Sequence, residues 1–476
     1  MKNLIISLFL LLLIPHSFFA QQIQGKGSHQ EHSEQFGSTI KLISQFDLNG
    51  KDIIPLQNKR VKALSKVVFG FLPYWQYDAG AHTNMHYDLL THLAAFDFQA
   101  SSTGAITYPS NWPWTDAINA AHFEGTKVIM VVTNFTATEI HTLLTNNTSK
   151  NNLFNNIKNT ITNFQLDGVN IDFELINSSD RGSVLNNFMS DLTNYIHTNL
   201  PGKEVSFDSP AVNWSGWDFN GLAQSVDYLI IMGYDYNGSW SSSTGAVAPL
   251  THPSGGICVT KTINDDYGVP LSNFPQKLIL GVPYYGKHWK TSSNIAGAPV
   301  ITYIGSTVYR DTVDEAISYG GNIWNTDSQT PYYTWEFGVW NQVWADNEQS
   351  LDLKYNLALN KNLGGIGIWA LNYDGNRSEL WDLIDTKFNS ALAVDDSFIK
   401  KQINLYPNPT KTHLKVLNSN LIKLVIIDIF NVYGQKIKNC NVKNDIIDMA
   451  NLKSAFYFIR IVDENGNQAV FKVIKS

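Results

Sequence analysis

The sequence predicts an α/β protein: a (β/α)8 TIM barrel with a small α+β insertion between strands 7 and 8, followed by a small all-β C-terminal domain. Eight short apolar runs, of the kind that form buried strands, follow one another between residues 67 and 369, with helix-compatible stretches between several of them. Such alternation indicates a parallel sheet, and eight strands favour a closed barrel over an open sheet. No Gly-x-Gly-x-x-Gly turn follows the first run, which argues against a dinucleotide-binding fold.

The elements follow in chain order. The expected strands cover residues 67–71, 93–98, 127–132, 168–173, 205–207, 228–232, 277–282 and 365–369. The helix-compatible stretches cover residues 114–124, 153–164, 184–199 and 350–362. Residues 290–338 are rich in Tyr and Thr, and we expect them to form an insertion that makes one wall of a cleft. The aromatic residues of this insertion include Tyr303, Trp324, Tyr332, Tyr333 and Trp335.

The chain before the barrel differs in composition. Residues 1–20 combine a short basic start with an apolar run from Leu4 to Ile14, a pattern typical of a secretory signal rather than of a retained anchor. The run is shorter than the about 20 residues that a spanning helix needs. Residues 21–65 are polar, and we expect a solvated leader or linker there. The alternative is a metal site made by the cluster His29, Glu31, His32 and Glu34.

The chain after the barrel changes character again. The barrel domain is expected to cover residues 66–388, and residues 389–402 form a polar connector. From Ile403 to Ser476, β-type runs separated by Gly and Asn turns predict the small all-β domain. This domain carries no paired acid, nucleophile or metal set.

Composition excludes several functional classes. Of 476 residues, 43% are hydrophobic and 16% are charged, which is enough for a sizeable core. The net charge of -7, without a long basic run, argues against nucleic-acid binding. Two cysteines allow neither a disulfide framework nor a paired-cysteine zinc site. With 13 Trp, 21 Tyr and 25 Phe, the chain has rings to spare for a cleft that binds a neutral ligand.

The most informative segment is the octet Asp167-Gly168-Val169-Asn170-Ile171-Asp172-Phe173-Glu174 at the end of the fourth strand. Alternate residues of a strand share a face, so Asn170, Asp172 and Glu174 point into the barrel, where catalytic groups lie at the C-terminal strand ends. Two close carboxyls in an aromatic pocket cannot both ionise easily, and the one with the raised pKa acts as an acid. This is glycosidase chemistry; the alternative is an acidic strand end that caps a turn or binds calcium.

The octet resembles that of the family 18 glycoside hydrolases, which include chitinases and endo-β-N-acetylglucosaminidases. The family pattern Asp-x-x-Asp-x-Asp-x-Glu is met by Asp167, Asp172 and Glu174, whereas Asn170 stands at its second Asp. This Asn and the segment 132–135 resemble the subgroup related to spore-cortex peptidoglycan glycosidases. Three further segments resemble the family in the expected order: Met232-Gly233-Tyr234-Asp235, residues 277–286 and residues 364–369. The resemblance covers residues 67 to 388.

The resemblance implies a retaining, substrate-assisted mechanism through an oxazolinium intermediate. It makes Glu174 the acid and later the base, Asp172 the residue that orients the sugar's acetamide, and Tyr234 a hydrogen-bond donor to it. The expected catalytic residues are Glu174, Asp172, Tyr234 and Asp167. The expected substrate-binding residues are Asp235, Met232, Trp369, Asn170, Tyr285, Phe135 and Tyr74. Trp369 is expected to be the sugar platform, with filling of the barrel top as its alternative role; no metal or other cofactor is expected.

The C-terminal domain resembles the sorting domain of type IX secretion. The resemblance rests on Leu405-Tyr406-Pro407-Asn408-Pro409, on residues 431–437 and on Phe456-Tyr457-Phe458-Ile459. It implies passage across the outer membrane and removal of the domain, which leaves the barrel secreted or held at the outer surface. A carbohydrate-binding β-sandwich is the alternative, although the domain has no Trp.

These observations predict a secreted glycosidase that hydrolyses β-1,4 bonds of N-acetylglucosamine-containing glycans, with chitin or chitooligosaccharides first. Peptidoglycan and N-glycan substrates are the alternatives, as is a catalytically inactive sugar-binding barrel, against which the retained Glu174, Asp172 and Tyr234 argue. The expected partners are this glycan and the secretion machinery, with no nucleic acid, and the protein is expected to be a monomer. Peptide-cleaving or metal-dependent chemistry lacks a nucleophile elbow or a His-Glu-x-x-His helix.

Overall fold

The computed structural model describes residues 26–37, 50, 52–57, 64–389, 403–418, 423–431, 436–440, 446–464 and 468–476. The chain divides into two compact units, one of residues 1–62 and 66–384 and the other of residues 63–65 and 385–476. The predicted signal sequence and residues 390–402 of the predicted connector lie outside the described residues.

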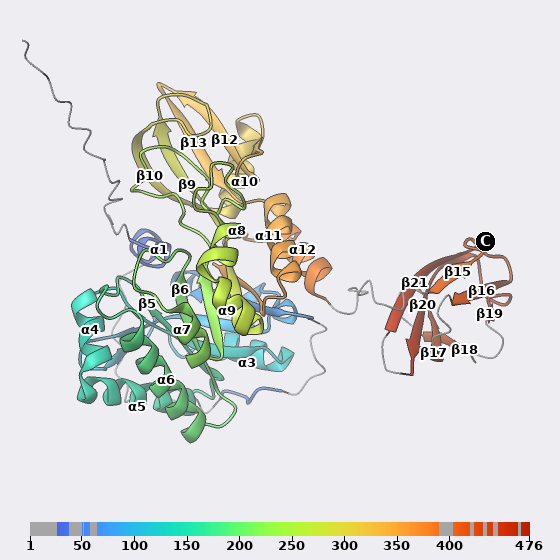
Figure 1. The fold of residues 1–476 in the computed structure, drawn as a ribbon, viewed down its shortest axis with the longest axis horizontal. Coiled ribbons are helices and arrows are strands. Elements are labelled where there is room, and N and C mark those ends of the chain that lie inside the picture. The colour runs from blue at the N-terminus through green and yellow to red at the C-terminus, as the bar shows by residue number, and fades with distance from the viewer. Residues whose placement is uncertain are drawn as a thin grey trace, which may run out of the picture. The chain divides into compact units, whose positions relative to one another are not determined.

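The first unit contains a closed parallel barrel (Figure 1). Its eight strands are β1 (Val67–Pro73), β2 (His92–Ala100), β4 (Lys127–Asn134), β5 (Gly168–Phe173), β6 (Glu204–Pro210), β7 (Tyr228–Met232), β8 (Leu278–Pro283) and β14 (Gly365–Trp369). Neighbouring strands pair in parallel, and β1 pairs with both β2 and β14, which closes the ring. All eight predicted strands are confirmed, several of them longer than predicted. The short β3 (Ile106–Thr107) adds an antiparallel strand beside β2.

The barrel strands are apolar because both of their faces are covered. Every residue of β5 and β8 is buried, as expected where helices cover the outside and side chains fill the inside. Close strand pairing also explains Gly365, where a Cβ would overlap the carbonyl oxygen of Val67 on β1.

Helices surround the strands, and each predicted stretch is helical. These four helices are α3 (Thr115–Glu124), α5 (Asn147–Asn163), α6 (Ser183–Asn199) and α11 (Glu348–Asn360). In α6 the buried apolar residues recur every three or four positions, which gives the helix one face toward the barrel. The other helices of the barrel region are α2 (Tyr74–Asp78), α4 (Ala137–Thr145), α7 (Phe219–Ser225), α8 (Val259–Lys261), α9 (Gly268–Asn273) and α12 (Glu379–Phe388).

The predicted α+β insertion lies between β8 and β14 as a five-stranded antiparallel sheet with one helix, α10 (Tyr309–Ser318). Its strands are β9 (Tyr285–Thr291), β10 (Val300–Val308), β11 (Ile323–Asn325), β12 (Thr330–Phe337) and β13 (Val339–Ala345). The insertion is therefore longer than the predicted 290–338, because β9 and β13 pair from Gly286 with Ala345 onward.

The described part of the polar segment before the barrel differs from the solvated leader that we expected. Residues 28–36 form a helix, α1 (Ser28–Phe36), in which Ser28, His29 and His32 are buried. Their polar side chains are buried because they meet polar partners at the C-terminal end of the barrel, as described below.

The second unit contains two antiparallel sheets, which confirms the predicted all-β domain. One sheet has β15 (Ile403–Tyr406), β16 (His413–Asn418) and β19 (Ile446–Asp448). The other has β17 (Leu424–Phe430), β18 (Lys436–Cys440), β20 (Ala455–Asp463) and β21 (Gln468–Lys475). Apolar residues from both sheets, such as Leu414, Ile427 and Ile459, form one core. No helix in the described part of the chain has the length and apolar character needed to span a bilayer.

Candidate active site

Glu174 and Asp172 lie at the C-terminal end of β5, as the alternation of the strand predicts. Asp172 is 0% exposed, and the Glu174 side chain is 8% exposed. The backbone N–H of Glu174 donates to the carbonyl oxygen of Asn134 at the end of β4, over 3.2 Å. This bond continues the strand pairing and holds the carboxyl at the mouth of the barrel.

Glu174 has the pKa of a general acid. Burial, followed by the nearby Asp172 carboxylate, raises the pKa of Glu174 from 4.5 to about 8. The carboxyl therefore holds a proton at neutral pH. A general acid needs such a proton in order to donate it to a glycosidic oxygen.

Tyr234 and Asp235 follow β7 and lie in the same site. Tyr234 is buried, and burial raises its pKa well above the usual range, so its hydroxyl keeps its proton. Asp235 has a positive φ of 58°. Its Oδ1 accepts from the Tyr285 hydroxyl over 2.7 Å and lies 3.0 Å from the Lys287 ammonium. Burial alone would raise the pKa of Asp235, but Lys287 lowers it, so this carboxylate stays charged.

Trp369 forms an apolar floor at the end of β14. It is 1% exposed, and its ring meets those of Phe96 and Phe71 edge-on, with centroids 4.8 and 5.9 Å away. The His29 ring lies over this indole, with ring centroids 3.8 Å apart, so the face of Trp369 is covered in this structure.

The remaining expected binding residues lie around this mouth. Tyr285 begins β9 and bonds to Asp235, whereas Met232 is half-buried at the end of β7. Tyr74 is buried in the first turn of α2 after β1. Phe135 is half-buried directly after β4.

Asp167 does not belong to the site, contrary to the prediction. It precedes β5 at the opposite end of the barrel from Glu174. Its carboxylate lies 2.9 Å from His122 Nε2, accepts from the Val128 backbone N–H over 2.9 Å, and pairs with the Lys203 ammonium at 2.9 Å. These bonds tie strand ends together, so Asp167 has a structural role.

Asn170 also differs from its predicted role as a substrate contact. Its amide donates to Asp208 Oδ2 and its oxygen accepts from the Ser206 hydroxyl, both over 2.7 Å. Because it is 0% exposed and both its polar atoms are occupied inside the barrel, Asn170 supports the residues above it rather than a ligand.

Two buried carboxyls near the site were not predicted. Asp208 on β6 has its pKa raised well above the usual range by burial and by Asp172. Asp97 on β2 accepts from the Thr133 hydroxyl over 2.7 Å, and burial raises its pKa to about 6. A sequence signal existed for Asp97, which is the only acid in the mostly apolar strand β2, whereas Asp208 lies among Ser206, Ser209 and Glu204 on β6 and gave no such signal.

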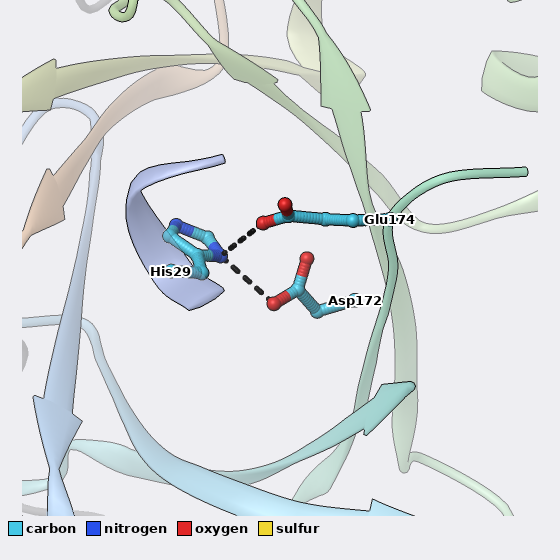
Figure 2. Close-up of side chains that lie close together, drawn as sticks. All are labelled: His29, Asp172 and Glu174. Carbon is cyan, nitrogen blue, oxygen red and sulfur yellow. Dashed lines mark hydrogen bonds and ion pairs between the residues drawn. The ribbon is translucent and has the colours of Figure 1, made fainter. Parts of the chain in front are cut away.

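Helix α1 reaches into the same site, which the sequence did not indicate. Its His29 faces both Asp172 and Glu174 (Figure 2), with Nδ1 2.8 Å from Asp172 Oδ2 and 3.6 Å from Glu174 Oε1. The other ring nitrogen, Nε2, lies 2.8 Å from the Tyr234 hydroxyl. One imidazole ring thus spans the distance between Asp172 and Tyr234.

The same three side chains bear on the question of a metal. In the described residues, His29, Asp172 and Glu174 offer ligand atoms within 4.8 Å of one another. The 2.8 Å between His29 and Asp172 is a hydrogen-bond distance, whereas two ligands of one tetrahedral zinc lie about 3.3 Å apart. The other three members of the sequence cluster have other partners: Glu31 pairs with Lys287, Glu34 pairs with Lys26, and His32 accepts a hydrogen bond from Trp369 Nε1. The arrangement is that of an ion pair.

The chain resembles known proteins along both units. Residues 48–374 match the model of the glycosyl hydrolases family 18, and residues 404–476 match that of the secretion system C-terminal sorting domain. The sorting domain indicates that the chain is secreted or held at the outer cell surface.

Three known proteins illustrate the barrel's similarity. Human di-N-acetylchitobiase is 32% identical over 259 residues, 47% of this chain and 64% of that protein. The cortical fragment-lytic enzyme of Bacillus subtilis is 26% identical over 321 residues, 63% of this chain and 68% of that protein. A solved family 18 chitinase from Cycas revoluta, in complex with allosamidin, shares the fold with a TM-score of 0.59 and 20% identity, over 67% of this chain and 99% of that chain. The chain thus spans less than two thirds of the human chitobiase.

The family match covers more than half of the chain and includes the octet on β5, with Asp172 and Glu174 placed together at the barrel mouth. This protein belongs to the glycosyl hydrolases of family 18 and carries a C-terminal secretion sorting domain.

Proposed function

We propose that this protein is a secreted glycosidase that hydrolyses β-1,4 bonds in N-acetylglucosamine-containing glycans, with chitooligosaccharides or chitin as first candidates. The observation that carries the proposal is the pairing of Glu174, with a pKa of about 8, and Asp172 on one face of β5. Tyr234 and the Trp369 ring lie close to this pair, because the imidazole ring of His29 contacts Asp172, Tyr234 and Trp369 at once.

The residues support a retaining, substrate-assisted mechanism. The protonated Glu174 gives its proton to the glycosidic oxygen, and the bond from that oxygen to the anomeric carbon breaks. The carbonyl oxygen of the same sugar's 2-acetamido group forms the new bond to the anomeric carbon, which leaves an oxazolinium ion. Asp172 stabilises the positive charge, and the Tyr234 hydroxyl donates to the acetamide oxygen. Water then attacks the anomeric carbon, the bond from this carbon to the acetamide oxygen breaks and restores the 2-acetamido group, and the water gives one proton to the Glu174 carboxylate.

The other groups of the site support sugar binding. The Trp369 ring offers its face to the sugar, and Asp235, kept charged by Lys287, accepts hydrogen bonds from sugar hydroxyls. The human relative is a di-N-acetylchitobiase, and the Cycas relative is a chitinase solved with allosamidin. These names favour short N-acetylglucosamine oligomers as the first substrates to test.

Peptidoglycan is the second candidate substrate, and one observation favours it. Asn170, the departure from the family octet, resembles the spore-cortex subgroup, and the matched cortical fragment-lytic enzyme is covered over 68% of its length. The hydrogen-bonded pair Asn170–Asp208 lies inside the barrel. Because Asp208 interacts electrostatically with Asp172, the pair influences the charge of the site whichever glycan binds.

The test measures product release from chitin oligosaccharides, peptidoglycan and a chitobiose-core N-glycan. Because α1 lies in the site, the full-length chain is assayed both as wild type and with Ser28→Ala/His29→Ala, each with and without Glu174→Gln. Cleavage of one glycan that is lost with Glu174→Gln supports the proposal and names the substrate. Binding without cleavage by any chain would make the barrel a sugar-binding module instead.

A further inference from the structure

We propose that helix α1 is an intramolecular inhibitor, which occupies the sugar site in the intact chain and must leave before a glycan binds. The inference rests on the proposed function in one respect: that function identifies the ligand that α1 excludes as a glycan. The contacts that hold the helix are properties of this chain and do not depend on that function.

His29 occupies the centre of the site. Its Nδ1 bonds to Asp172 and its Nε2 to the Tyr234 hydroxyl, each over 2.8 Å. Its ring lies over Trp369, with centroids 3.8 Å apart and planes inclined by 33°. These are the three groups that the proposed mechanism assigns to the acetamide and the sugar ring, so His29 and a bound sugar exclude each other.

The start of the helix binds the other carboxylates. The backbone N–H of Ser28 donates to Asp235 Oδ2 over 2.8 Å, and the Ser28 hydroxyl lies 2.7 Å from Asp235 Oδ1. The backbone N–H of Gly27 bonds to Glu174. The first N–H groups of a helix have no partner within the helix and carry a partial positive charge. At the start of α1, the carboxylates of Asp235 and Glu174 accept hydrogen bonds from these N–H groups. The same carboxylates would otherwise be available to hydrogen-bond donors of a ligand.

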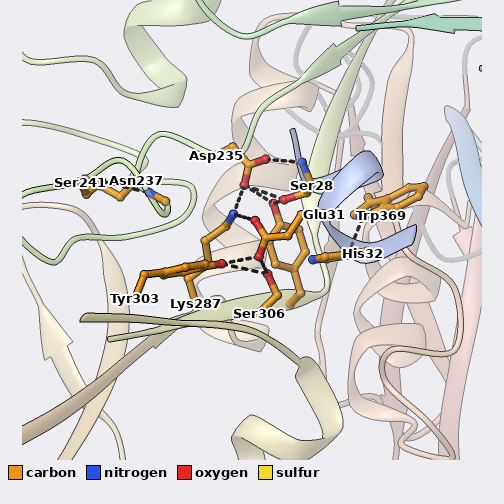
Figure 3. A network of polar contacts seen from close by, with 12 residues as sticks. Ser28, Glu31, His32, Asp235, Asn237, Ser241, Lys287, Tyr303, Ser306 and Trp369 are labelled. Carbon is orange, nitrogen blue, oxygen red and sulfur yellow. Dashed lines mark hydrogen bonds and ion pairs between the residues drawn. The ribbon is translucent and has the colours of Figure 1, made fainter. Parts of the chain in front are cut away.

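The outer part of the helix is fastened to the insertion (Figure 3). Glu31 lies 3.1 Å from the Lys287 ammonium and accepts hydrogen bonds from Tyr303 and Ser306. Gln35 forms two bonds with the backbone of Ser306: its amide donates to the carbonyl oxygen over 2.8 Å, and its oxygen accepts from the N–H over 3.2 Å. The insertion thus holds α1 over the barrel mouth.

The character of the buried face separates an inhibitor from an ordinary core helix. A helix that packs for stability buries an apolar stripe, whereas α1 buries Ser28, His29 and His32. His32 accepts from Trp369 Nε1 over 3.0 Å, which uses the indole N–H of the proposed platform. With α1 in place, Asp172 and Trp369 are 0% and 1% exposed, so a glycan has no access to them.

The charge of His29 also suits the site. Burial alone would lower the pKa of His29, but Asp172 and then Glu174 raise it to about 9, so the ring is an imidazolium at neutral pH. In the proposed mechanism the positive oxazolinium forms beside the same Asp172. The helix therefore places a cation where the reaction develops one, which is the arrangement of a tight inhibitor.

The test compares the full-length wild-type chain with three full-length variants. Ser28→Ala/His29→Ala removes the contacts of the helix to Asp172, Tyr234 and Asp235. Gly27→Val adds a side chain where a Cβ already overlaps the Glu174 carboxylate, at a φ of -62° and ψ of 162° that valine accepts. Glu34→Ala changes the same helix on its exposed side, where the Glu34 side chain is 51% exposed, and is the matched control.

Two quantities are measured for each chain: the rate of chitooligosaccharide cleavage and the affinity for allosamidin, the ligand of the Cycas relative. We expect Ser28→Ala/His29→Ala and Gly27→Val to raise both by the same factor, at least about tenfold, because helix and ligand compete for one site. Glu34→Ala should match the wild type. Thermal unfolding by circular dichroism checks that each variant is folded, and two variants at separate positions keep the test valid if one of them is not.

The outcomes separate this inference from the proposed function. If the wild type cleaves and binds as well as both variants, the inhibitor inference is overturned and the glycosidase stands. If no chain cleaves but the variants bind allosamidin at least about tenfold more tightly, the inhibitor stands and the proposed hydrolysis fails. If folded variants neither cleave nor bind, both are overturned.

Discussion

The side-chain amide of Asn170 donates to Asp208 Oδ2 over 2.7 Å, and both residues are fully buried in the barrel below Asp172. This pair takes the place of the carboxylate that the family octet has at Asn170. With the neutral amide of Asn170, Asp208 is the single carboxyl of this pair. An Asp at position 170, as in the family octet, would place a second carboxyl beside it.

Asn170→Asp should destabilise the protein. It replaces the donor with a second carboxyl beside Asp208, and the two must share a proton. The loss of a buried hydrogen bond should lower the free energy of unfolding at pH 7 by about 1 to 3 kcal/mol. Burial and Asp172 raise the folded-state pKa of Asp208, so the loss should shrink as pH falls from 7 toward the unfolded pKa of about 4 and be smallest below it. Denaturant unfolding against pH measures this.

The exchange Asn170→Asp/Asp208→Asn is the control for this prediction. It reverses donor and acceptor and restores the amide–carboxylate bond, so it should recover most of the stability. An exchange no more stable than Asn170→Asp would show that position, rather than the bond, decides.

Glu174→Gln should lower kcat by two to four orders of magnitude, roughly the contribution of a general acid–base group, with oligosaccharide binding kept. The protonated form of Glu174 is the active one, and it exists below its pKa. In the helix-released chain at saturating substrate, kcat should therefore fall as pH rises through the pKa of Glu174, which burial and the neighbouring Asp172 raise above its ordinary value. An alkaline limb near 4.5, the ordinary glutamate value, would contradict the acid assignment.

Helix α1 should leave the barrel at alkaline pH. The pKa of His29 is raised from 6.5 to about 9, so the stabilisation that its charge gives to the bound helix is fully present below about pH 6.5 and is lost as pH rises through about 9. Glu174 ionises near 8, which strengthens the attraction before His29 loses its proton. The charged or titratable groups that face His29 are Asp172, Glu174, Asp208, Tyr234 and His32.

Allosamidin affinity against pH tests this release of α1. The affinity of the wild type relative to Ser28→Ala/His29→Ala should rise between about pH 8.5 and 10, because only the wild type carries the titrating ring. A ratio that stays constant across this range would show that His29 does not govern the release.

Asp167→Asn should affect stability and not catalysis. Burial alone would raise the pKa of Asp167, but the hydrogen bond from His122 and the charge of Lys203 lower it, so the carboxylate stabilises the fold above its unfolded pKa. We expect the free energy of unfolding at pH 7 to fall by about 1 to 3 kcal/mol. At the same time, kcat of the folded enzyme should stay within about threefold. The two quantities are measured by urea unfolding and by steady-state kinetics. A hundredfold fall in kcat with unchanged unfolding would restore Asp167 to the active site.

The sequence alone determined the barrel and the placement of the carboxyls of Asp172 and Glu174 on one face of a strand. Short apolar runs separated by helices specify parallel strands, and the period of two along β5 turns Asp172 and Glu174 to one face wherever that strand lies. The C-terminal domain was equally readable, because its strands and turns are local patterns. These features depend on neighbours a few positions apart.

Tertiary structure decided the rest, because it depends on residues far apart in the chain. The octet places Asp167 in the same pattern as Glu174, but Asp167 precedes the strand, and the fold shows that its partners at that end are His122 and Lys203. Helix α1 gave no signal as a packed element, because its buried face is Ser and His rather than an apolar stripe. Its place is set by complementarity between those polar groups and carboxylates more than a hundred positions away, which no local periodicity records.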